Sequence, residues 1–124
     1  MLAHEPSTAV AVVIPCFNDG RYLQEALNSL YAQSCGDWEA VVVDDGSTDP
    51  RTLNVLDAIN HPRVLVHRHE KNRGLAAARN TGVKLTKAPI VFPLDADKLI
   101  FRSISLREAW ISLREKPAFP KYNS

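Results

Sequence analysis

Four short runs of Val, Ile and Leu, separated by segments of helical spacing, limit more than any other feature how this chain can fold. They cover residues 10–14, 39–43, 64–68 and 90–94 and read VAVVI, EAVVV, VLVHR and IVFPL. Runs of this length and β-branched content are typical of strands. The first two runs are almost continuously apolar, which indicates strands covered on both faces, as in a parallel sheet.

Two amphipathic helices are expected between the first three runs. The first covers residues 22–33 and follows Asn18 or Asp19, either of which is a suitable N-cap. Its apolar stripe consists of Tyr22, Leu23, Ala26, Leu27, Leu30 and Tyr31. The second opens with Asp49 as the N-cap and Pro50 at the first helical position, and it then repeats apolar residues at helical spacing.

Two more helices complete the pattern. Residues 74–85, GLAAARNTGVKL, form a helix of small residues that can lie close against a sheet. A last helix is expected from Ser105, because Ser105 and Glu108 have the spacing of a capping box. The order β-α-β-α-β-α-β-α predicts an α/β fold, a three-layer α/β/α sandwich with a mainly parallel sheet and right-handed crossovers. In such sheets ligands bind beyond the carboxyl ends of the strands.

The composition predicts one globular domain over residues 1–124. With 124 residues, of which 45% are hydrophobic and 23% charged, the chain is long enough to bury a core. We expect residues 1–8 to be an N-terminal extension and residues 117–124 to be a C-terminal tail. The net charge of +1 gives no extended basic surface, so no nucleic-acid partner is expected.

The sequence has no features of a membrane or secreted protein. No apolar run approaches the roughly 20 residues that span a bilayer, and the first ten residues lack the basic and apolar regions of a signal peptide. We therefore expect a cytoplasmic location. Cys16 and Cys35 are too few for a disulfide framework and lack the CxxC spacing of a metal site, so both are expected to be free thiols.

Polar residues follow each predicted strand, and the second strand ends in VVVDDGSTD. Asp44 comes directly after the buried run, and Gly46 permits a sharp backbone turn. A carboxylate at this edge is a good acceptor for the N–H of a nucleobase or for a ribose hydroxyl, which is the function expected of Asp44. Asp49, in contrast, is expected to build the turn and cap the next helix.

The third strand leads into NRGLAAARN, where Gly74 brings a helix N-terminus close to the sheet. The free N–H groups there favour an anion, and Arg73 and Arg79 can add charge-assisted hydrogen bonds to phosphate or carboxylate. A solvated basic patch on a surface helix is the alternative explanation. His67 and His69 are expected to be ordinary solvated imidazoles, with a metal-binding pair as the alternative.

The fourth strand ends in PLDADK, which places Asp95 and Asp97 one residue apart. In a strand that continues outward, this spacing points both carboxylates to one face. Two carboxylates that converge there repel each other unless a cation lies between them. Mg²⁺ and Mn²⁺ take oxygen ligands of this kind, and Mg²⁺ is usually held by one or two carboxylates together with substrate phosphate oxygens.

Taken together, VVIPCFND, VVVDDGSTD, NRGLAAARN and PLDADK occur in the order and at about the spacing of one known pattern. From Ala9 to Ile100 the chain resembles the nucleotide-binding half of family 2 glycosyltransferases, which are inverting enzymes with a GT-A fold. The resemblance implies a Rossmann-like nucleotide-diphospho-sugar transferase. Such an enzyme moves a sugar from a UDP-, GDP- or dTDP-sugar to a hydroxyl of a glycan or lipid-linked acceptor, as in cell-surface polysaccharide synthesis.

The resemblance also implies roles for individual residues. The nucleotide-binding residues that it implies are Pro15, Phe17, Asn18, Asp44, Gly46, Arg73, Gly74, Arg79 and Asp95. Among these, Asp44 matches the aspartate that contacts the base, and Arg73 is expected to face the diphosphate. Asp95 and Asp97 match the DxD motif, which holds the ribose and a divalent metal, Mn²⁺ or Mg²⁺, that bridges the diphosphate.

The chain departs from the family after this motif. Related enzymes carry the acceptor site and the general base well beyond the DxD, whereas 27 residues follow Asp97 here. Glu108 and Glu115 stand in no context that matches the base. We therefore expect a chain truncated after the DxD motif, without its general base, and self-association through the surface left exposed. A lipid-linked acceptor would place the protein at the inner face of the membrane.

Three alternatives remain from the sequence. A non-catalytic module of the same fold would bind a nucleotide sugar without turnover. LDADKLI also resembles the nucleophile strand of haloacid dehalogenase phosphatases, in which the acidic pair comes near the start of the domain. An acidic pair followed late in the chain by Lys116 and Pro117 also resembles the pattern of phosphoacceptor receiver domains. In those domains the acidic pair ends the first strand, whereas Asp44 and Asp45 end the second strand here.

Overall fold

The computed structural model describes residues 10–33 and 38–94, in which strands and helices alternate as predicted. The elements are β1 (Val10–Cys16), α1 (Gly20–Tyr31), β2 (Trp38–Asp44), α2 (Pro50–Ala58), β3 (Val64–Arg68), α3 (Leu75–Leu85) and β4 (Ile90–Pro93). The expected helix from Ser105, the thiol of Cys35, the extension 1–8 and the tail 117–124 lie outside the described residues.

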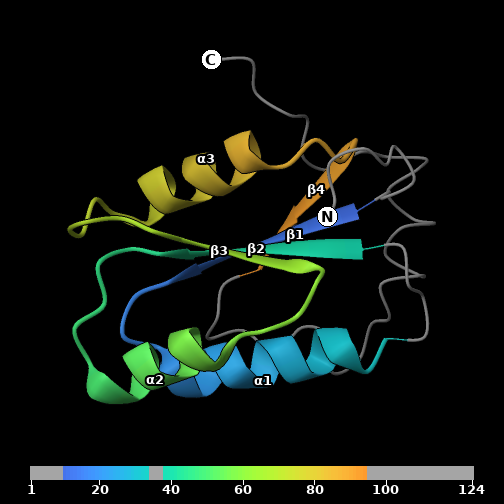
Figure 1. The fold of residues 1–124 in the computed structure, drawn as a ribbon. Helices are drawn as coiled ribbons and strands as arrows, with labels where there is room; N and C mark the ends of the chain where they lie inside the picture. Colours follow the sequence, from blue (N-terminus) through green and yellow to red (C-terminus); the bar gives the residue numbers. More distant parts are fainter. Residues whose placement is uncertain (1–9, 34–37, 95–124) are drawn as a thin grey trace.

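The strands form a parallel sheet in the order β3-β2-β1-β4. From β1 to β3 the chain moves across the sheet in one direction, and right-handed connections then place α1 and α2 on the same face. The step from β3 back to β4 runs in the opposite direction, so α3 lies on the other face (Figure 1). The described residues therefore form the predicted three-layer α/β/α sandwich.

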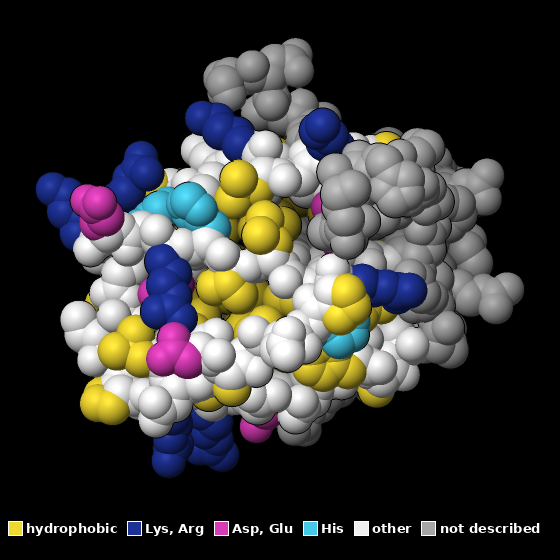
Figure 2. Space-filling model, viewed as in Figure 1, with side chains coloured by type: hydrophobic (Ala, Val, Ile, Leu, Met, Phe, Trp, Pro, Cys, Tyr) yellow, Lys and Arg dark blue, Asp and Glu magenta, His cyan; other side chains and the backbone are white. Residues whose placement is uncertain are grey.

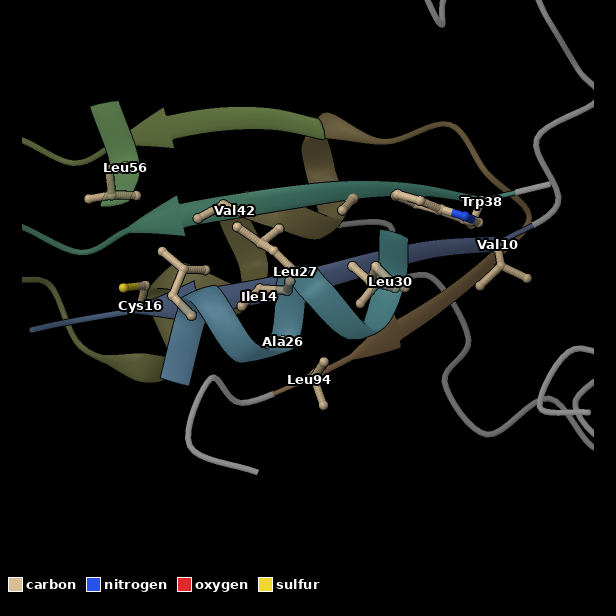
Figure 3. Packing of buried hydrophobic residues seen from close by; sticks show 13 residues of the cluster. Val10, Ile14, Cys16, Ala26, Leu27, Leu30, Trp38, Val42, Leu56 and Leu94 are labelled. Carbon is tan, nitrogen blue, oxygen red and sulfur yellow. The ribbon is translucent and has the colours of Figure 1, made fainter. Parts of the chain in front are cut away.

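Alternate residues of the two central strands fill a core on each face of the sheet. All residues of β1 and β2 are buried, which explains their continuous apolar runs. The side facing α1 and α2 carries the larger cluster, which is shown in Figure 3. Its members are Val10, Val12, Ile14, Cys16, Leu23, Ala26, Leu27, Leu30, Trp38, Ala40, Val42, Leu56 and Leu94. Each fully buried leucine of this cluster stabilises the fold by about 1.5–3 kcal/mol.

On the opposite face, α3 lies close to the sheet because its inner surface is made of small residues. Ala78 is fully buried against Val41 and Val43 of β2. Gly82 allows a still closer approach to β1, since a Cβ atom added there would lie 2.3 Å from Cγ1 of Val13. The close packing expected from the small-residue pattern is confirmed.

The first turns of α1 and α2 are joined at Gly20. Its N–H donates to Oγ1 of Thr52 at 2.9 Å, and an added Cβ atom would lie 2.7 Å from the Cα atom of Thr52. Asp49 caps α2 as predicted, because its Oδ2 accepts the N–H of Thr52 at 3.0 Å. Pro50 occupies the first position of this helix, also as predicted.

Two details of α1 differ from the prediction. Asp19 stands at the N-cap position but makes no side-chain capping hydrogen bond. Tyr22 and Tyr31, assigned to the apolar stripe, are 39% and 40% exposed, because the leucines at the centre of the stripe already fill the space against the sheet. Within residues 10–33 and 38–94, no helix is long and apolar enough to cross a membrane.

Candidate functional site

The carboxyl ends of the parallel strands meet at one edge of the sheet, on the left of Figure 1. Going along the chain, β2 is added on one side of β1 and β4 on the other. This reversal is the topological switch point, beside which open α/β sheets bind their ligands. The last described residue of the β4 segment, Leu94, donates its N–H to the carbonyl of Val13 at 2.8 Å, so this segment runs beside β1 as far as Leu94.

Asn18 joins the loop after β1 to the loop after β2. Its Oδ1 accepts the N–H groups of Thr48 and Asp49, each at 2.9 Å, and its own N–H donates to Oγ of Ser47 at 2.9 Å. Asn18 has a φ of 55°, a left-handed conformation that asparagine tolerates better than most residues. The side-chain carbonyl of this predicted nucleotide-binding residue thus organises the two loops.

Asp44 ends β2 at the same edge, opposite Cys16 of β1 and Arg68 of β3. The residue is 3% exposed, and its Oδ1 accepts the N–H of Ser47 at 3.0 Å. A carboxylate has two oxygens and about four acceptor positions, so one bond to Ser47 leaves capacity for a ligand. The position fits the expected acceptor for a nucleobase or ribose.

Gly46 brings the loop after β2 against the segment between β3 and α3. It has a φ of 81°, and an added Cβ atom would lie 2.6 Å from the backbone nitrogen of Asn72. Only glycine combines this conformation with such a close backbone approach. The backbone conformation and the close packing of these two segments therefore explain why residue 46 is a glycine.

Asp45, one residue after the predicted Asp44, is the carboxylate that holds these loops together. Its Oδ1 accepts the N–H of Arg73 at 2.9 Å and its Oδ2 accepts the N–H of Gly74 at 2.8 Å. Nδ1 of His69 lies 2.8 Å from Oδ1. Burial raises the pKa of Asp45, but the hydrogen bonds from His69, Arg73 and Gly74 outweigh burial and hold the pKa below its ordinary value of 3.8.

The expectation that His69 is solvated is wrong, because this residue is 8% exposed and its ring is held on both sides. Nδ1 faces Asp45, and Nε2 lies 2.9 Å from Oγ1 of Thr81 in α3. This contact could not be predicted from local sequence, since Asp45 and Thr81 lie 24 and 12 positions from His69 along the chain. The doubled acid in VVVDD was the only available signal for Asp45.

Two N–H groups just before the first turn of α3 have an internal partner. The N–H groups of Arg73 and Gly74 are directed at the carboxylate of Asp45. The side chain of Arg73 is exposed. Figure 2 shows lysine or arginine side chains around an acidic residue at the turn between β3 and α3, which contains Glu70, Lys71 and Arg73.

The other predicted nucleotide-binding residues lie around this cluster. Pro15 is buried in β1 opposite Val43 and builds the strand end. Phe17 follows β1 and is 44% exposed, which leaves its ring accessible to a flat ligand. Arg79 is half-buried on α3. The fold thus brings Phe17, Asn18 and Asp44 to one edge, next to the segment that carries Arg73.

The predicted metal ligands, Asp95 and Asp97, lie outside the described residues. Within the part of the chain that the structure describes, no group of three His, Cys, Asp or Glu side chains could hold a metal ion. The alternative metal pair of His67 and His69 also fails, because both ring nitrogens of His69 already have partners.

Comparisons of the sequence and of the structure with known proteins both find glycosyltransferases. The family model described as Glycosyl transferase family 2 matches residues 11–115. The glycosyltransferase GlyG of Streptococcus pneumoniae serotype 4 is 32% identical over 117 residues, which cover 90% of this chain and 37% of GlyG. S. aureus TarS, solved in complex with UDP, has a TM-score of 0.71 and 31% identity over 86% of this chain and 32% of that chain. The mannosyltransferase PcManGT of Pyrobaculum calidifontis, solved with GDP-Man and Mn²⁺, has a TM-score of 0.64 and 32% identity. The match covers 75% of this chain and 29% of that chain.

These matches agree with the fold and with the sequence motifs. The chain spans about a third of the length of GlyG and of the TarS structure. The similarity in structure confirms the expected α/β fold of the GT-A type. Because the family model covers most of the sequence, the chain belongs to family 2 of the glycosyltransferases.

Proposed function

We propose that this chain binds the nucleoside diphosphate of a sugar donor at the carboxyl edge of its sheet, as part of a glycosyltransferase. The observation that supports this most is the position of Asp44, a buried carboxylate at the switch-point edge whose Oδ1 accepts the N–H of Ser47. It lies beside a loop junction built by Asn18, and the following residue, Asp45, accepts the backbone N–H of the exposed Arg73. TarS solved with UDP and PcManGT solved with GDP-Man and Mn²⁺ support the binding of a nucleotide.

Each side chain has a distinct part in this proposal. Asp44 accepts an N–H of the base or a ribose hydroxyl, and the exposed ring of Phe17 packs against the flat base. Arg73 donates charge-assisted hydrogen bonds to the diphosphate, helped by Arg79. Pro15, Asn18, Gly46 and Gly74 shape the loops in which these contacts occur.

Asp95 and Asp97 are the proposed ligands of a divalent metal, with Asp95 also contacting the ribose. Their oxygen donors suit Mn²⁺ or Mg²⁺. When bound, such an ion supplies Lewis-acid stabilisation of the charge on the departing nucleoside diphosphate. The described residues contribute binding and orientation of the nucleotide.

Transfer to an acceptor hydroxyl of a glycan or lipid-linked sugar, with inversion at the anomeric carbon, is the proposed reaction. Inversion requires the acceptor oxygen to attack from the face opposite the nucleotide, after a general base has taken its proton. Neither Glu108 nor Glu115 stands in a context that matches that base, so the base is not among the residues proposed above.

Calorimetric titration tests the donor site. UDP-glucose, GDP-mannose and dTDP-glucose are titrated with and without Mn²⁺. We expect one of them to bind in a metal-dependent manner, and we expect Asp97→Ala to remove the metal dependence. Asp44→Ala should weaken binding by about tenfold or more, since a hydrogen bond to a charged group contributes about 1.5–3 kcal/mol.

The exposed carboxylate of Asp57, which forms a surface ion pair with Arg68, provides the matched control. Asp57→Ala should leave donor affinity unchanged. Absence of binding by all three donors would overturn the proposed function. Binding without release or transfer of sugar would instead favour a module that holds the nucleotide sugar without turnover.

A further inference from the structure

A hydrogen-bonded network of polar side chains runs through the interior beneath the candidate site. Oγ1 of Thr81, on α3, lies 2.9 Å from Nε2 of His69, and Nδ1 of His69 lies 2.8 Å from Oδ1 of Asp45. Thr81 also donates its hydroxyl to the carbonyl of Ala77 at 2.9 Å. The network therefore connects the loop after β2, the end of β3 and the body of α3.

This network is enclosed by protein, so the loss of a hydrogen-bond partner within it is costly in free energy. The side chains of His69 and Asp45 are 3% and 5% exposed. A buried carboxylate needs hydrogen-bond donors on its oxygens, and an ionised carboxylate can only accept. Nδ1 of His69 is therefore the donor to Asp45, and it shares Oδ1 with the N–H of Arg73, while Oδ2 accepts the N–H of Gly74.

The carboxylate held in this way fixes the segment from residue 72 to residue 74. The N–H groups of Arg73 and Gly74 both donate to Asp45, and Nδ2 of Asn72 donates to the Asp45 carbonyl at 3.3 Å. The backbone of His69 adds a further link, since its N–H donates to the carbonyl of Asp44 at 2.8 Å. The direction in which Arg73 leaves the backbone therefore depends on Asp45.

We propose that His69 is a positioning residue for the donor diphosphate. Through Asp45 it fixes the backbone of residues 72–74, and this places the side chain of Arg73 and the first turn of α3 at the carboxyl edge of the sheet. The role in binding rests on the proposed function, whereas the effect on the backbone does not. His69 contacts no ligand in this mechanism and acts only through Asp45.

The two ring nitrogens of histidine suggest variants that separate the two bonds. Asn carries its amide nitrogen near the position of Nδ1, so His69→Asn keeps the donor to Asp45 and gives up Thr81. Gln reaches toward the position of Nε2, so His69→Gln keeps the contact with Thr81 and gives up Asp45. His69→Ala removes both, and His67→Ala removes the neighbouring histidine, whose ring lies 5.7 Å away.

The test combines amide exchange with nucleotide titration, both followed by NMR on the whole chain. We expect faster exchange of the Arg73 and Gly74 amides in His69→Ala and His69→Gln, and rates close to wild type in His69→Asn and His67→Ala. UDP affinity in the presence of Mn²⁺ should fall about tenfold in the first two variants, as is typical when an outer partner of a binding site is removed. Affinity for uridine, which has no phosphate, should stay within about twofold, because Asp45 holds the segment that faces the diphosphate.

Each outcome decides the inference. Unchanged exchange at Arg73 and Gly74 in His69→Ala would overturn it, as would an equal loss of UDP and uridine affinity, which indicates general loosening of the fold. If His69→Ala does not fold, the comparison of His69→Asn with His69→Gln gives the answer. The exchange measurement needs no ligand, so it remains decisive if wild type binds no nucleotide, a result that would overturn the proposed function alone.

Discussion

At the scale of single residues, Asp45 shows how one buried carboxylate can organise a functional edge. It accepts hydrogen bonds from two backbone N–H groups and from His69. These donors favour the charged form over the neutral one, and they hold the pKa of Asp45 below its ordinary value although burial acts in the other direction. The consequence is a dependence of stability on protonation.

Replacing Asp45 with Asn should lower the free energy of unfolding at pH 7 by about 1–3 kcal/mol, because an amide nitrogen cannot accept and one buried donor loses its partner. The contribution of the Asp45 charge is complete above the unfolded-state pKa of 3.8 and is lost as the pH falls through the lower folded-state pKa. Urea unfolding at several pH values measures this. A difference between wild type and variant that stayed constant from pH 7 to pH 2.5 would contradict the assignment.

At the scale of elements, the contact of α3 with β1 depends on the absence of one methyl group. A Cβ atom on Gly82 would lie 2.3 Å from Cγ1 of Val13 and 3.2 Å from its Cγ2. Both atoms belong to a β-branched side chain with little freedom about χ1. The helix must therefore move away from the sheet if residue 82 carries a side chain.

We expect Gly82→Ala to destabilise the fold by about 1–3 kcal/mol, the typical cost of overpacking, although alanine favours the helix by about 1 kcal/mol over glycine. Val13→Ala in the same chain removes the obstructing methyl groups, so Gly82→Ala should be neutral or stabilising in that background. Chemical denaturation of the four chains in this cycle gives the coupling energy. Additive effects of the two substitutions would show that the clash is relieved elsewhere.

The elements were predictable because their signals are local. Apolar runs gave the strands, and the cap at Asp49 with Pro50 gave the start of α2. The exposure of Tyr22 and Tyr31 was not predictable, since it depends on how much of the α1 stripe the sheet can cover. The candidate site shows the same limit: Asp44 and Asn18 follow from position, whereas the Asp45–His69 contact joins residues 24 positions apart.

At the scale of the whole molecule, Cys16 reports on the integrity of the core, because it lies at the end of the central strand β1 and is 1% exposed. Burial, with smaller contributions from the charges of Asp19 and Asp44, raises the pKa of this thiol to about 11, although hydrogen bonds from the Asp19 backbone and Ser47 act against the rise. The thiolate that reacts with alkylating reagents is therefore disfavoured in the folded state.

In a Cys35→Ser variant, the remaining thiol should react with iodoacetamide at pH 8 only through opening of the sheet, at a rate that rises with urea in parallel with the unfolding constant. Stability should also fall between pH 9 and about pH 11, because the unfolded thiol ionises from 9.0 while the folded one keeps its proton. Rapid modification without urea would show that the end of β1 opens by itself.

The buried Glu39 has a consequence for the accuracy of folding. It lies in β2 beside Ala11 of β1, and it accepts a hydrogen bond from Oγ1 of Thr86. A shift of β2 by one residue would exchange its two faces, and the valines on either side would fit nearly as well as before. Glu39 would then enter the leucine core of α1 without a partner, at a large cost in free energy. One carboxylate thus selects among strand alignments that the apolar residues alone leave almost equal.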